Sequence, residues 1–365
     1  MSKAAELAAL IGSQTAQSNR NLIINGAMQV AQRGTSFTDV GGTNAVYTVD
    51  RFNMQNNGTA GRVTVTQESV TDLPGFANAL KLDVTTADTS IAAAEYFGIQ
   101  TRLEGNSLQQ LQKGTSSAKA VTLSFYAKGT AKTYVAELED NNSRVNGQKF
   151  TVSTSWQKFT LTYTGDTSGV IADDNAAGLN LHFWLHGGSN FTSGTFTSNT
   201  WASTVQANRM PGVGSIFSST DNELFITGVQ LELGEQATPF EHRSFADELQ
   251  RCKRYYQRWE STGSDATSNK AIGAGVWHGT TQVLAAMSYE VEMRSAPTMT
   301  LSPTDGLKAY GGGFAEARSG GNGLDTIGAK TARINFTVST SRTAGQGTMI
   351  QIKDSGDTLE ADAEL

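Results

Sequence analysis

The stretch LNLHFWLHGG, residues 179–188, decides the fold class of the first two thirds of the chain. In a β-strand, successive side chains point to opposite faces of the sheet. One face of this stretch is apolar and comprises Leu181, Phe183 and Leu185. The opposite face places two imidazoles around an indole: His182, Trp184 and His186. The pattern predicts a strand with one face in the core. The opposite face is expected to contact another group and not solvent alone.

Similar segments flank this stretch on both sides. They include VTVTQ, ALKLDV, VTLSFYAKG, YVAELED, QKFTLTYTG and ELFITGVQLELG. Only 17% of the residues are charged, and 38 glycines supply turns between short strands. Alternating strands separated by turns predict an antiparallel sandwich or barrel. The first large domain is expected at residues 21–243.

A helix is predicted at 244–262, with Ser244 as its N-cap and acidic residues in the first turn. Its apolar positions repeat every three or four residues: Phe245, Leu249, Cys252, Tyr256 and Trp259. This seam either packs on a sandwich of the same chain or meets other copies of the chain.

Strand-like segments resume after this helix and predict a smaller β-sandwich at 263–365. Within it, GGGFAEARSGGNG, from Gly311 to Gly323, is expected to be a surface loop. Residues 1–20 predict a short N-terminal helix with an apolar stripe of Leu7, Leu10 and Ile11. That helix is either a frayed terminus or an element that docks on a partner. The overall prediction is an all-β chain with a short N-terminal helix and one connecting helix.

Composition excludes several functional classes. The net charge of −6 and the lack of a long basic run argue against nucleic-acid binding. No segment is apolar enough for membrane insertion, and the start lacks the features of a signal peptide. Folding is therefore expected in a cytoplasm. The single cysteine, Cys252, excludes intrachain disulfides and any Cys-rich zinc site.

Several phrases resemble a group of bacteriophage tail-fibre proteins, whose first region is similar to carbohydrate-binding modules with a jelly-roll sandwich. The phrases are NLIINGAMQVAQRGTSFT, YTVDRFNM, VTLSFYAKG, STSWQKFTLTYTG and ITGVQLELGEQATPFEHRSFADELQRCKRYYQ. The resemblance implies a virion tail protein made in a bacterial host, a homotrimer, docking on other tail proteins and attachment to host-surface glycan. Such modules often hold a structural calcium through an Asp of the last strand. Thr227 and Gly228 stand at that place, so no calcium is expected.

Glycan contact is the function considered for the unusual strand face. Aromatic rings and nearby polar groups suit sugars, so His182, Trp184 and His186 are candidates, with Tyr126 as a second platform. The same face is alternatively covered by the long loop at 187–214 or by a neighbouring subunit.

No catalytic residues, metal ligands or cofactors are predicted. His182 and His186 lie four residues apart, about 13 Å on one strand, which is too far for them to share an ion. No spacing of carboxylates indicates a glycosidase pair. The functional prediction is a non-catalytic tail-fibre subunit. The alternatives are a purely structural virion protein (fibre shaft, adaptor or capsid decoration) and a glycan depolymerase.

Overall fold

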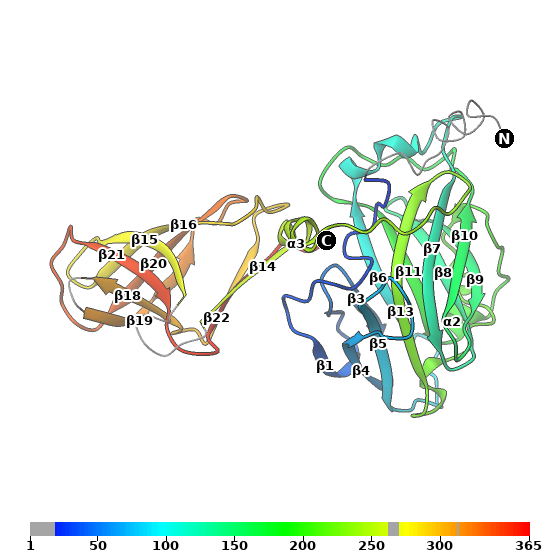
Figure 1. Ribbon diagram of the computed structural model, residues 1–365, viewed down its shortest axis with the longest axis horizontal. Coiled ribbons are helices and arrows are strands. Elements are labelled where there is room, and N and C mark those ends of the chain that lie inside the picture. The colour runs from blue at the N-terminus through cyan, green and yellow to red at the C-terminus, as the bar shows by residue number, and fades with distance from the viewer. Residues whose placement is uncertain (1–18, 262–269, 312–313) are drawn as a thin grey trace. The chain divides into compact units, whose positions relative to one another are not determined.

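A computed structural model describes residues 19–261, 270–311 and 314–365 (Figure 1). The chain forms two compact units, one ending at Glu248 and also including Leu365, the other covering 249–364. Regular structure is mostly strand in both units, which confirms the all-β prediction. The N-terminal docking helix with Leu7, Leu10 and Ile11 lies outside the described residues.

The first unit is a sandwich of two antiparallel sheets. Sheet A contains β1 (Ser36–Gly42), β4 (Thr59–Ser69), β5 (Asn78–Thr86), β13 (Glu223–Leu233), β7 (Val121–Gly129) and β10 (Gln157–Tyr163), in that spatial order. Sheet B contains β12 (Ala202–Ser203), β9 (Arg144–Thr151), β8 (Thr133–Asp140), β11 (Ala177–Gly187), β6 (Tyr96–Glu104), β3 (Asn53–Asn57) and β2 (Val46–Tyr47). Short helical turns occur at η2 (Gly105–Ser107), η3 (Gln109–Leu111), α2 (Ser189–Thr192), η4 (Gln206–Asn208) and η5 (Ile216–Ser218). The chain crosses repeatedly between the sheets, as in a jelly roll.

Aromatic side chains fill the space between sheets A and B. Phe125 of β7 lies 5.0 Å from Phe183 of β11, edge to face, and stacks on Phe159 of β10 at 5.1 Å, centroid to centroid. Phe125 and Phe183 are fully buried in one cluster that contains residues of both sheets. The core therefore uses the apolar face that the alternation in β11 predicted.

The connecting helix is shorter than predicted. Helix α3 spans Phe245–Lys253, capped by Ser244, whose Oγ accepts a hydrogen bond from the backbone N–H of Asp247. The chain then enters strand β14 (Tyr256–Glu260), which pairs with β22 (Thr358–Asp362). Tyr and Trp favour a pleated surface, and pairing with β22 outweighs the helical periodicity.

The predicted heptad seam is therefore wrong as a single helical stripe. Only Phe245, Leu249 and Cys252 lie on α3. Tyr256 and Trp259 are buried on β14, where an odd separation of three places them on opposite faces. The boundary expected at 262 also moves, because β14 belongs to the second unit.

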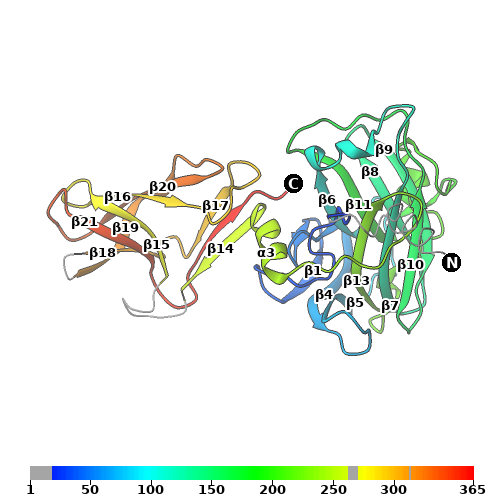
Figure 2. The same ribbon diagram turned by 45° about the horizontal axis from the view of Figure 1, so that its top comes forward.

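The second unit is built from a closed barrel and a small sheet (Figure 2). The barrel strands are β15 (Ala271–Trp277), β16 (Gln282–Ser288), β20 (Thr331–Val338), β19 (Phe314–Asp325), β18 (Leu307–Gly311) and β21 (Gly347–Ile352). The sheet contains β14, β22 and β17 (Thr298–Ser302). The strands of the predicted smaller C-terminal sandwich thus form a closed barrel and a separate small sheet. Closure leaves the barrel without sheet edges.

The glycine-rich segment predicted as a surface loop is largely strand β19. Its pairing with β20 shifts register between Arg318 and Gly320 and again before Gly323. Gly321 and Gly323 have φ angles of +83° and +78°, which L side chains rarely adopt. Glycines at bulges allow a barrel strand to bend, so the composition reflects curvature instead of a loop.

Candidate functional site

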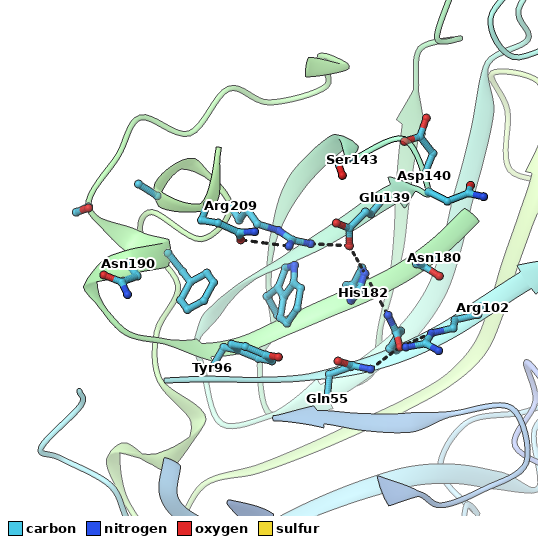
Figure 3. A pocket seen from close by; sticks show the side chains of 17 residues that line it. Gln55, Tyr96, Arg102, Glu139, Asp140, Ser143, Asn180, His182, Asn190 and Arg209 are labelled. Atoms are coloured by element: carbon cyan, nitrogen blue, oxygen red, sulfur yellow. Dashed lines mark hydrogen bonds and ion pairs between the residues drawn. The ribbon is translucent and has the colours of Figure 1, made fainter. Parts of the chain in front are cut away.

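A groove of about 950 Å³ lies over the outer face of sheet B (Figure 3). It is lined by residues of β3, β6, β8 and β11, of the turn after β8 and of the 188–214 segment. They are Gln55, Tyr96, Gln100, Arg102, Glu139, Asp140, Asn141, Ser143, Asn180, His182, Trp184, Asn190, Phe191, Ser193, Gln206, Ala207 and Arg209. Two of the four residues predicted to contact glycan, His182 and Trp184, belong to this lining.

Strand alternation explains this placement. Leu181 and Phe183 point into the core of the sandwich, so His182 and Trp184 point outward. β8 pairs with β11 so that Glu137 lies opposite His182. The outward face of two adjacent strands therefore carries carboxylates beside an imidazole and an indole.

Arg209 connects these groups from the 188–214 segment. Its Nε lies 2.9 Å from Glu137 Oε1, and its Nη2 lies 2.9 Å from Glu139 Oε2. The Nε1–H of Trp184 donates to the same Glu137 oxygen at 2.9 Å. Figure 3 shows polar contacts running from Arg209 through Glu139 and His182. Glu137, His182 and Arg209 are buried, Glu139 is partly exposed, and each carboxylate is matched by a cation or a donor.

The ring faces of Trp184 are covered. The imidazole of His182 stacks on Trp184 with centroids 4.6 Å apart and planes 9° apart, and the guanidinium of Arg209 lies 4.9 Å from the ring centroid. Trp184 also packs with Val135 and Met210 in a small apolar cluster beneath the 188–214 segment. Only 4% of Trp184 is exposed, so it forms the floor of the groove and offers no free face to a ligand. The alternative in which the loop covers this face describes Trp184 correctly.

Burial and pairing set the ionisation of this network. Burial raises the pKa of Glu139, but the hydrogen bond to His182 and the charge of Arg209 outweigh it and lower that pKa to about 2. Burial lowers the pKa of His182, which is therefore neutral at pH 7. Because its Nε2 lies 2.9 Å from Glu139 Oε2, we assign the proton to Nε2. His182 Nδ1 is buried and has no hydrogen-bond partner among the described residues.

Side chains that the sequence analysis missed form the accessible part of the groove. Tyr96 is half-buried and meets Trp184 and Phe191 edge to face, at 5.7 and 5.3 Å between centroids. Exposed amides of the 188–214 segment face the same space, among them Asn190 and Gln206. The alternation of apolar and polar residues could not identify these positions, because Tyr96 is the first residue of β6 and the amides lie in a loop.

Tyr126, predicted as a second platform, does not line this groove. It belongs to β7 of sheet A, whereas the groove lies on sheet B, and its ring packs at 5.2 Å from that of Phe76.

His186 is also wrong as a groove residue. The pairing of β11 with β6 shifts register between Trp184 and His186. His186 is fully buried and does not belong to the lining of the groove. His186 packs edge to face on Phe217, 5.3 Å away, instead of facing the groove.

The carboxylates and imidazole of the groove do not form a metal site. Glu137, Glu139 and His182 each place one ligand atom within 4.8 Å of the others. The guanidinium of Arg209 already contacts both carboxylates, and a metal ion would have to displace it. The cluster is an ion-pair network.

No protein-family model matches the chain, and no curated protein matches it. Among solved structures, the chain is similar to one described as "CBM4 structure and function", with 13% identity over 57% of this chain and 98% of that one, at a TM-score of 0.29. A family 11 carbohydrate-binding module of Clostridium thermocellum has 14% identity over 54% and 98%, at 0.28. A family 22 module of Clostridium thermocellum Xyn10B has 9% identity over 61% and 99%, at 0.30. Similarity of this size leaves the function to be argued from the groove itself.

In the described part of the chain, every helix is too short or too polar to cross a bilayer.

Proposed function

We propose that this chain binds glycan in the groove of sheet B and does not cleave it. The observation that carries the proposal is an open groove of about 950 Å³ that combines a half-buried tyrosine ring with exposed amides. Ligand sites of this size commonly combine an apolar surface with a few placed polar groups. Sugars present both an apolar C–H face and hydroxyl edges, so Tyr96 suits the first and Asn190 and Gln206 suit the second.

The floor of the groove supports a hydroxyl-bearing ligand. Two acceptors there, His182 Nδ1 and Asn180 Oδ1, have no hydrogen-bond partner in the described structure. Unpaired buried polar atoms are costly, and turning these side chains towards the groove on binding would let a ligand hydroxyl satisfy them.

The ionisation of the floor supports binding without cleavage. Glycoside hydrolysis needs one carboxyl with a raised pKa that protonates the leaving oxygen. Glu139 instead has a pKa of about 2, lowered by His182 and Arg209 against the opposing effect of burial. A depolymerase would require a second, protonated acid in the same groove, and a time course without reducing-end release would exclude that alternative.

Replacing Tyr96 with Ala is expected to weaken glycan binding about tenfold or more, because the ring is the accessible apolar surface of the groove. A glycan array on the intact chain identifies the ligand, and calorimetry compares the variants. Trp156→Ala, which removes an aromatic ring beside β10 of sheet A, is the matched control and should bind normally. Equal affinities for wild type and Tyr96→Ala would place the binding surface elsewhere.

We further propose a role as a virion tail-fibre subunit that attaches to host-surface glycan. The order of resembling phrases along residues 21–257 supports this role, and repeated copies would convert modest single-site affinities into firm attachment. If glycan arrays stay blank while labelled protein is found on particles, the alternative of a purely structural virion protein is favoured.

A homotrimer is expected in solution. Phe245 at the start of α3 is 57% exposed, a large apolar side chain that a neighbouring copy would cover. Analytical ultracentrifugation should give three times the chain mass of 38.8 kDa, and Phe245→Glu should give the monomer. A monomeric wild type would remove both the trimer and the avidity it provides.

A further inference from the structure

A second cluster of ionisable side chains lies outside the groove, where the segment after β5 meets the end of β11. Asp88, Glu95 and His186 each place one ligand atom within 4.8 Å of the others. They are 4%, 7% and 0% exposed, respectively. In the groove cluster, the guanidinium of Arg209 contacts both carboxylates. Among the described residues, no lysine or arginine contacts the side chains of this second cluster. The proposed glycan function does not use them.

Two atoms of this cluster are buried and without a hydrogen-bond partner: Glu95 Oε2 and His186 Nε2. They face one another at 3.5 Å. Two ligands bound to one zinc ion at about 2.0–2.1 Å, at a tetrahedral angle, lie about 3.3 Å apart. The separation is long for a hydrogen bond but matches the edge of a zinc coordination tetrahedron.

Neighbouring groups hold the ligands in a suitable state. His186 Nδ1 lies 2.8 Å from Ser215 Oγ, and with the proton on Nδ1 the lone pair of Nε2 points into the cluster. Asp88 Oδ2 accepts hydrogen bonds from Thr59 Oγ1 and from the backbone N–H of Ala60, both at 2.9 Å. These bonds orient the Asp88 carboxylate, and its second oxygen accepts a hydrogen bond from the backbone N–H of Ser90.

We propose that Asp88, Glu95 and His186 bind a divalent transition-metal ion, with zinc as the best chemical fit. One imidazole and two carboxylates are ligands that zinc accepts, and an imidazole argues against calcium or magnesium. Two buried carboxylates side by side repel one another, and a dication relieves that repulsion.

The site joins parts of the chain that border the groove. The backbone N–H of Gly188 donates to Glu95 O at 2.8 Å, and that of Asn190 donates to Ala93 O at 2.9 Å. A metal ion on Glu95 and His186 would therefore fasten the start of the 188–214 segment to the segment before β6. The role is structural, because the ligands are buried away from the groove.

The test measures zinc in the intact chain, purified from zinc-supplemented medium and desalted. We expect about one zinc per chain by elemental analysis. After chelation, zinc added back at about 100 times Kd should raise Tm by about 5–10 °C. Glu95→Gln and His186→Gln should each abolish stoichiometric binding, while His242→Gln, which removes an exposed imidazole, should retain it. Loss of zinc from His242→Gln would indicate adventitious surface binding.

A wild type that retains no zinc and shows no rise in Tm overturns the proposal, as does a larger rise with calcium than with zinc. If both ligand variants fail to fold, the absorption spectrum of cobalt-substituted wild type tests whether the site binds metal. The visible bands of tetrahedral cobalt support the site, and their absence rejects it. None of these measurements depends on glycan binding. Failure of the metal proposal would therefore leave the glycan proposal unaffected, and the reverse also holds.

Discussion

Replacing Arg209 with Met is expected to lower the free energy of unfolding by about 3–5 kcal/mol. The guanidinium is 8% exposed and contacts both Glu137 and Glu139, and Glu137 itself is 1% exposed. Methionine preserves much of the side-chain volume but leaves two carboxylates in a poorly solvated site without their cation. Removing one partner of a buried ion pair costs far more than the pair contributes net.

Chemical denaturation of the intact chain measures this loss, and Lys128→Met is the control. Lys128 pairs with Asp72, whose side chain is 56% exposed, so its loss should cost less than about 1 kcal/mol. Adding Glu137→Gln to Arg209→Met should recover part of the stability, because one unpaired charge is removed. Equal losses for Arg209→Met and Lys128→Met would mean that water reaches the network and screens it.

The same network shows how far the sequence could predict the site. Alternation along 179–188 correctly placed His182 and Trp184 on the outer face of a strand, because one buried face fixes the register of the other. It could not foresee that Arg209, 25 residues beyond Trp184, returns to cover the indole. Pairing across a long polar loop depends on its path, which local patterns do not specify.

The errors elsewhere share a physical cause. Periodicity over 245–259 fitted a helix, yet pairing with β22, about 100 residues away, makes its last part a strand. Similarly, His186 lies outside the groove, and the pairing of β11 with β6 shifts register just before it. Glu95 and Asp88 lie about 90 and 100 residues before His186, without any ligand spacing that the sequence could reveal. Long-range contacts overrode local preference in each case.

Acid is expected to destabilise the first unit in two successive steps. Burial lowers the pKa of His182, so the unfolded chain binds a proton there near pH 6.5 while the folded chain does not. Stability from this group is present above about pH 6.5 and falls as the pH drops below it. The pKa of Glu139 is also depressed in the folded state, so its contribution is present above about pH 4.5 and is lost as the pH falls towards 2.

The step from Glu139 should be large enough to measure. For Glu139, a folded pKa of about 2 against an ordinary value of 4.5 corresponds to about 2–3 kcal/mol, allowing for a side chain that is 21% exposed. Urea unfolding of the wild type and of Glu139→Gln at pH 7, 5 and 3 isolates the contribution of Glu139 ionisation to the free energy of unfolding. The variant begins less stable at pH 7 because it lacks the charge that Arg209 and His182 favour, and its stability should change less between pH 5 and 3. Parallel losses in the two proteins would show that Glu139 titrates normally and that Arg209 does not hold it ionised.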